Sequence, residues 1–140
     1  MERRLKVRDL MSTELVTLTE DDTLAHAQDC MARGRIRHLP VLHGRKLVGL
    51  VTHRDLLAAS FSIFAEVRAS EQRRVFSTVP VTELMHRDVV TVGPDLRVAE
   101  AARILMQNKF GCLPVVAEDG DLVGIVTEAD FMRLTVRLLQ

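Results

Sequence analysis

Short apolar runs alternate with apolar positions at helical spacing along the first half of the chain. Residues 15–18 form a short β-prone run, and apolar side chains from Leu24 to Met31 then recur with the period of a helix. Residues 36–42 and 47–51 are two further apolar runs, the second nearly all apolar and so expected to be buried. A second helix is predicted to start at Thr52. The predicted order is strand, helix, strand, strand, helix.

Helix and turn signals separate these elements. The acidic and hydroxyl residues at 19–22 suit a helix start, and Gly34 is expected to end that helix. The His-Gly-Arg sequence at 43–45 is typical of a hairpin turn between the second and third strands.

The second half of the chain repeats this order. Residues 89–92 predict a strand, residues 112–116 and 122–126 predict a hairpin, and a final helix is expected to start at Thr127. The predicted core face of the intervening helix comprises Val98, Ala101, Ala102, Leu105 and Met106.

The two halves also match residue by residue. Val7-Arg8-Asp9-Leu10-Met11 returns as Val81-Thr82-Glu83-Leu84-Met85, and Leu39-Pro40-Val41 returns as Leu113-Pro114-Val115, both shifted by 74 positions. After that point the shift is 75, so the copies differ by one residue in a predicted loop. We therefore expect an α/β (α+β) fold made of two β-α-β-β-α units packed about a pseudo-two-fold axis, sheet to sheet.

The repeat gives predicted domain bounds of 1–60 and 80–140. The connector at 61–79 is long, contains neither Gly nor Pro, and is interpreted as an extension of the second helix followed by a short loop. Phe61 and Phe64 lie in it; they serve self-association in one interpretation and pack on the chain's own core in the other.

Composition narrows the class of function. The chain has 140 residues, 47% of them hydrophobic, and its net charge is zero, which argues against a general nucleic-acid or membrane-surface binder. The charge is nevertheless uneven between the copies. Residues 33–54 are basic, whereas the corresponding part of the second copy carries Glu118, Asp119, Asp121 and Glu128. We interpret Arg33, Arg35 and Arg45 as solvated surface residues.

Several chemistries have no sequence support. Cys30 and Cys112 do not occupy equivalent repeat positions and are expected to be buried reduced thiols of a cytoplasmic protein. The N-terminus lacks an apolar signal, and the apolar stretch at 56–65 is too short to span a bilayer. The histidines have no metal spacing, and neither a catalytic triad nor a Gly-rich phosphate loop is found. We expect no membrane association, no metal, no required cofactor and no enzyme activity.

These motifs together identify a family resemblance. Leu-Met near each repeat start, Leu-Pro-Val, and Gly-hydrophobic-Val-Thr-x-x-Asp, each present twice, resemble the CBS (cystathionine β-synthase) domain over residues 7–132. The chain thus looks like a tandem CBS pair, with nothing evidently fused to it. The resemblance implies a homodimer with four CBS units in a flat disc, and an adenine nucleotide or adenosyl ligand in the cleft between paired units.

The duplicated Thr-x-x-Asp motif is the candidate ligand site. Thr52 with Asp55, and Thr127 with Asp130, fall in the first turn of a predicted helix, where backbone amides lack partners and an anion is favoured. A carboxylate there can accept both hydroxyls of a ribose, which is the role that the family gives this Asp. The alternative is a capping box that binds nothing; the two roles are compatible.

The resemblance implies further contacts to the ligand. Arg37, His53 and Arg54 fall where phosphate partners occur in the family, and guanidinium suits phosphate oxygens. The second copy has Gly111, Glu128 and Ala129 at these places, so its site departs from the phosphate-binding pattern.

The adenine base is expected to lie against the backbone at Val16 and Thr17, or at Val90 and Thr91. Both valines are also expected to belong to the core.

The leading hypothesis is a non-enzymatic regulatory module for energy sensing that binds AMP, ADP, ATP or S-adenosylmethionine and signals the ligand's level to an unknown partner. The rival hypothesis is a ligand-free dimerisation or scaffold module. Nucleic-acid binding through the basic stretch is a weaker third, because aromatic residues make up only 4% of the chain.

Overall fold

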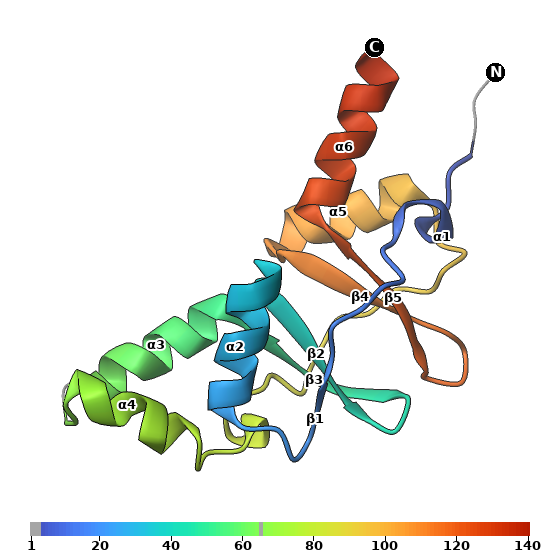
Figure 1. Cartoon of the computed structure of the whole chain (residues 1–140). Helices are drawn as coiled ribbons and strands as arrows, with labels where there is room; N and C mark the ends of the chain where they lie inside the picture. Colours follow the sequence, from blue (N-terminus) through green and yellow to red (C-terminus); the bar gives the residue numbers. More distant parts are fainter. Residues whose placement is uncertain (1–3, 65) are drawn as a thin grey trace. The chain divides into compact units, whose positions relative to one another are not determined.

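The computed structural model describes residues 4–64 and 66–140, except for the side chains of residues 63 and 64. These residues form two compact units (Figure 1). We call Val16–Val89 the central unit, and the described residues up to Leu15 together with Val90–Gln140 the terminal unit. The elements in chain order are α1 (Val7–Leu10), β1 (Leu18–Thr19), α2 (Leu24–Gly34), β2 (His38–His43), β3 (Lys46–Thr52), α3 (His53–Phe64), α4 (Ala69–Phe76), the 3-10 turn η1 (Val81–Glu83), α5 (Val98–Asn108), β4 (Cys112–Val116), β5 (Leu122–Thr127) and α6 (Glu128–Leu139).

The central unit is built on a three-stranded sheet in the order β1-β2-β3. β1 runs parallel to β2, with Leu18 opposite Val41, and β2 pairs antiparallel with β3, with Leu39 opposite Val51. These four side chains are fully buried. The sheet therefore supplies one wall of the core, and apolar residues of α2, α3 and α4 close it.

The terminal unit repeats this plan with a shorter sheet. β4 and β5 form an antiparallel hairpin, and the predicted strand at 89–92 is reduced to a single parallel bridge between Val92 and Val115. The predicted hairpin bounds are otherwise confirmed. The one-residue difference between the copies lies around the hairpin turn, as expected, since five residues separate Val41 from Leu47 and six separate Val115 from Leu122.

Each copy begins with a short segment, residues 7–12 in the first copy and 81–86 in the second, which we call the leading segment. The leading segment of each copy packs on the hairpin of the other copy. The Ser12 and Ile125 backbones exchange hydrogen bonds of 2.9 and 3.1 Å within the terminal unit. Leu50 and His86 do the same in the central unit, with both bonds at 2.9 Å. The compact units thus exchange the leading segments of the repeats. The domain bounds of 1–60 and 80–140 follow the repeat alone and stay a prediction.

Two glycines permit this exchange. A Cβ on Gly49 would lie 2.4 Å from the Met85 sulfur and 3.1 Å from the carbonyl oxygen of His86. Gly124 stands in the same relation to Met11, at 2.5 Å from its sulfur. The leading segment can therefore lie directly on the hairpin only where the strand carries no side chain.

We expect Gly49→Ala to lower the free energy of unfolding by about 1–3 kcal/mol, because the added methyl overpacks the buried Met85 side chain and the His86 backbone. Urea denaturation followed by circular dichroism measures this change. Gly93→Ala is the control, because a Cβ there would meet nothing within 4 Å. A Gly49→Ala chain as stable as the control variant contradicts the expected close approach.

The connector prediction is wrong in its main feature. The second helix does not continue through the connector; α3 ends at Phe64, and α4 forms a separate helix that packs on α2 and α3. The chain turns because Phe76, at the end of α4, is fully buried in the central core. Arg73 fixes α4 to α2 through two hydrogen bonds to the Asp29 carboxylate, of 3.0 and 2.8 Å. This guanidinium lowers the pKa of Asp29 below its usual range.

Other local expectations have mixed outcomes. Thr23, and not residues 19–22, caps α2, because its hydroxyl oxygen accepts the His26 amide proton at 3.2 Å. Phe61 is 71% exposed, whereas the side chain of Phe64 lies outside the described residues. Both cysteines are free thiols, and burial raises the pKa of Cys112 to about 12, which keeps it protonated and unreactive.

Candidate functional site

The N-terminus of α3 places Thr52 and Asp55 together. Strand β3 ends at Thr52 and α3 begins at the next residue, so that Asp55 falls in the first helical turn. The Thr52 hydroxyl donates a 2.6 Å hydrogen bond to Asp55 Oδ2, and the Asp55 amide donates to the Thr52 hydroxyl oxygen at 3.2 Å. The capping role predicted for this motif is therefore present.

His86 completes this group, and the sequence analysis did not single it out for this role. Its Nε2 lies 2.8 Å from Asp55 Oδ2, because the exchanged leading segment brings it to the end of β3. The Asp55 side chain is 23% exposed, and its Oδ1 accepts no hydrogen bond from the residues that the structure describes. One carboxylate oxygen is thus held, and the other is left for an additional donor.

The corresponding group of the terminal unit is closed. Thr127 and Asp130 form a capping box at the start of α6, with the Thr127 amide donating to Asp130 Oδ2 at 2.8 Å. Arg133, another residue that the sequence analysis missed, donates to Asp130 Oδ1 at 2.5 Å. Both oxygens of Asp130 are occupied, and its side chain is only 7% exposed.

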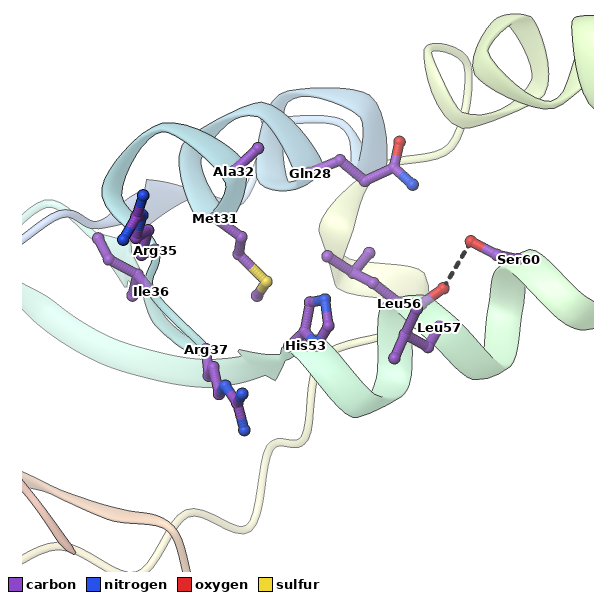
Figure 2. A pocket seen from close by; sticks show the side chains of 10 residues that line it. All are labelled: Gln28, Met31, Ala32, Arg35, Ile36, Arg37, His53, Leu56, Leu57 and Ser60. Atoms are coloured by element: carbon purple, nitrogen blue, oxygen red, sulfur yellow. Dashed lines mark hydrogen bonds between the residues drawn. The ribbon is translucent and has the colours of Figure 1, made fainter. Parts of the chain in front are cut away.

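An open pocket of about 510 Å³ lies between α2 and α3 of the central unit. Figure 2 shows Met31 and His53 directed into it from the two helices, with Arg37 at its edge. The structure thus brings two predicted phosphate partners, Arg37 and His53, to one pocket, and the His53 amide donates to the Arg37 carbonyl at 2.8 Å. The volume is within the range of small-molecule sites.

The pocket and the Asp55 carboxylate occupy different sides of α3. Successive helical residues project about 100° apart. His53, Leu56 and Ser60 accordingly face the pocket, whereas Thr52 and Asp55 are absent from its lining. Arg54 is exposed and likewise does not line the pocket. The predicted site residues therefore form two groups in the central unit, one around Asp55 and one around His53.

The expected base-binding positions are at the surface. Val16 and Val90 are 43% and 44% exposed, and Thr17 and Thr91 are half-buried. The expectation that the two valines belong to the core is wrong, because Leu18 and Val92 are the buried side chains of these segments. Their role toward an adenine base stays a prediction.

The second copy carries a negative charge at a position where the first copy has a predicted phosphate partner. Glu128 and Ala129, the counterparts of His53 and Arg54, are exposed in the first turn of α6, and the Glu128 amide donates to the Gly111 carbonyl at 3.4 Å.

Among the described residues, no cluster of His, Cys, Asp and Glu side chains suits a metal ion. In residues 4–64 and 66–140, no helix is long and apolar enough to cross a membrane.

Comparison with known proteins identifies the family. The sequence profile of the CBS domain matches the chain twice, over residues 7–62 and 81–137. The chain belongs to the CBS domain family. The resemblance drawn from the repeated motifs is confirmed, as is the mixed α+β fold with two CBS repeats.

Solved CBS-pair structures are similar over almost the whole chain. The AcuB protein of Vibrio cholerae is 38% identical, with a TM-score of 0.81 and coverage of 98% of this chain and 94% of the other. CBSX2 in complex with AMP is 28% identical, with a TM-score of 0.80 and coverages of 96% and 98%. The CBS pair of MJ0100, bound to 5'-methylthioadenosine and S-adenosyl-L-methionine, is 26% identical, with a TM-score of 0.80 and coverages of 97% and 99%.

The match to this chain spans very different fractions of the relatives' own lengths. A CBS domain-containing protein of Dictyostelium discoideum is 31% identical over 98% of this chain and 95% of its own length. The inosine-5'-monophosphate dehydrogenase of Korarchaeum cryptofilum is 37% identical over 84% of this chain, but the match spans 21% of the dehydrogenase. CBS pairs thus occur both as most of a protein and as a minor part of an enzyme.

Proposed function

We propose that this CBS pair is a non-enzymatic regulatory module that binds an adenine nucleotide or adenosyl compound at Asp55 and signals the level of that ligand to a partner protein. AMP, ADP, ATP and S-adenosylmethionine are the candidate ligands. The observation that carries the proposal is the Asp55 carboxylate, which has one oxygen fixed by Thr52 and His86 and the other without a donor among the described residues.

The ligands of the similar structures share a simple chemical feature. AMP, 5'-methylthioadenosine and S-adenosylmethionine all carry an adenine and a ribose with two free hydroxyls, whereas only AMP carries a phosphate. A carboxylate that accepts hydrogen bonds from two hydroxyl groups suits the ribose that they share. We therefore assign ribose recognition to Asp55 and treat Arg37, His53 and Arg54 as the groups that select among charged ligands.

The N-terminus of α3 supports an anionic ligand. The His53 and Asp55 amides already donate to the Arg37 carbonyl and the Thr52 hydroxyl, but the helix dipole favours negative charge near this end. The guanidinium groups of Arg37 and Arg54 are exposed, so that they can approach a phosphate without losing buried partners. This arrangement favours a nucleotide over an uncharged nucleoside in the central unit.

Isothermal titration calorimetry of the intact chain with AMP, ATP and S-adenosylmethionine tests the proposal, with 2'-deoxy-AMP as the matched control. We expect at least one of the three to bind, and 2'-deoxy-AMP to bind at least about tenfold more weakly than AMP, because one hydrogen bond to a charged acceptor is lost. Equal affinities of AMP and 2'-deoxy-AMP, or no heat with any of them, would overturn the ribose assignment.

A second candidate function is self-association, and a repeated surface pattern favours it. Leu57 and Phe61 on α3 are 44% and 71% exposed. Their counterparts in the second repeat, Met132 and Val136 on α6, are 64% and 56% exposed. Each pair lies one helical turn apart, which makes an apolar stripe on each helix. We propose that these stripes bind a second copy of the chain in a homodimer.

Sedimentation velocity of wild type and Phe61→Ser tests this second candidate. We expect a dimer for wild type and a monomer for the variant, because a hydroxyl replaces a large apolar group in the stripe. Met106→Ser on α5 is the control, since Met106, which was wrongly predicted to face the core, is 78% exposed and lies outside both stripes. A Phe61→Ser chain that sediments like wild type would remove the stripes from the dimer surface.

A further inference from the structure

Equivalent carboxylates in the two repeats differ in their hydrogen-bond donors and in their exposure. Asp55 has a donor only on Oδ2 among the described residues, whereas Asp130 has Thr127 on Oδ2 and Arg133 on Oδ1. The side chain of Asp55 is 23% exposed and that of Asp130 is 7% exposed. The terminal unit therefore lacks the open acceptor that the central unit offers.

Arg133 is the residue that makes this difference. It lies one turn after Asp130 on α6, and its Nη2 is 2.5 Å from Asp130 Oδ1. The residue at the same place in the first repeat, 75 positions earlier, is Ala58, whose methyl group cannot donate a hydrogen bond. The ion pair is thus a property of the second copy and not of the repeat as such.

The pair joins an exposed guanidinium to a nearly buried carboxylate. The Arg133 side chain is 68% exposed and that of Asp130 is 7% exposed, so water screens the pair only in part. Asp130 keeps its two contacts to Thr127 without it. The guanidinium nevertheless occupies the oxygen that a ribose hydroxyl would need, through a charge-assisted bond that an uncharged hydroxyl must displace.

We propose that Arg133 is a latch on the terminal unit's carboxylate, and that it limits the chain to one adenine nucleotide, bound in the central unit. This inference rests on the proposed function and adds to it the stoichiometry and the residue that sets it. Glu128 acts in the same direction, because it places a negative charge where the first repeat has His53.

Equilibrium dialysis with labelled AMP, at saturating concentration, tests the latch on the intact chain. We expect one AMP per wild-type chain and two per Arg133→Ala chain, with the second lost again in Arg133→Ala/Asp130→Asn. The converse variant, Ala58→Arg, should weaken binding in the central unit at least tenfold. Arg137→Ala, further along the same helix, is the control and should still bind one.

Two results overturn the latch: two AMP per wild-type chain, or one per Arg133→Ala chain. A ligand-independent measurement separates this failure from failure of the proposed function. Carbodiimide labelling of carboxylates, read by mass spectrometry, should modify Asp130 several-fold faster in Arg133→Ala than in wild type. If wild type binds none of AMP, ATP and S-adenosylmethionine, the proposed function fails, and equal Asp130 labelling in the two chains then also refutes the latch.

Discussion

Replacing Phe76 by alanine is expected to lower the free energy of unfolding by about 3–5 kcal/mol. Phe76 is fully buried and packs in the core that Leu18, Leu39 and Met31 share. Removing its ring leaves a cavity under α4 that the surrounding sheet and helices fill only in part. Urea denaturation followed by circular dichroism at 222 nm measures the loss.

Met106→Ala is the control for this substitution. It truncates a large apolar side chain that is 78% exposed and lies outside the proposed dimer stripes, so we expect a change within about 0.5 kcal/mol. Because Phe76→Ala could leave too little folded protein to measure, Phe76→Leu serves as a second variant, with an expected loss of about 1–1.5 kcal/mol. Equal stabilities of the Met106 and Phe76 variants would show that α4 does not contribute to the core.

Asp55→Asn is expected to weaken AMP binding about 10- to 100-fold, which corresponds to the loss of about 1.5–3 kcal/mol of charge-assisted hydrogen bonding. Asparagine keeps the shape of the side chain and an oxygen that can accept from Thr52, so the helix start should survive. Calorimetric titration with AMP measures the affinity, and a thermal melt checks folding.

Asp21→Asn is the charge-matched control for Asp55. Asp21 is exposed in the same unit and lies outside the proposed site, so the variant removes one negative charge without removing a ribose acceptor. We expect its AMP affinity to stay within twofold of wild type. An Asp55→Asn chain with wild-type affinity would mean that this carboxylate does not touch the nucleotide.

The sequence predicted the parts of the fold that local patterns determine. The bounds of β4 and α2 agree with the predicted ranges, because each depends on the period of apolar residues within one segment. The exchange of the leading segments was not predicted, since nothing local shows that Met85 packs on Gly49. Helix α4 was missed for a related reason: Phe76 is the only buried residue in a mostly polar segment.

The part of the candidate site that depends on local sequence was also predicted, and the part that depends on tertiary contacts was not. The Thr52 and Asp55 pair follows from a spacing of three residues at a helix start, which the sequence shows directly. His86 and Arg133 were missed because their contacts depend on tertiary placement and on a difference between the copies. Comparing repeat positions, His86 with Ser12 and Arg133 with Ala58, is the signal that could have drawn attention to them.

A crystal structure of the chain grown with AMP tests the ribose assignment most directly. We expect the two ribose hydroxyls to lie within hydrogen-bonding distance of the Asp55 carboxylate, with Oδ1 accepting at least one of them. A nucleotide bound with its ribose away from Asp55, while Oδ1 stays without a hydroxyl partner, would contradict this assignment.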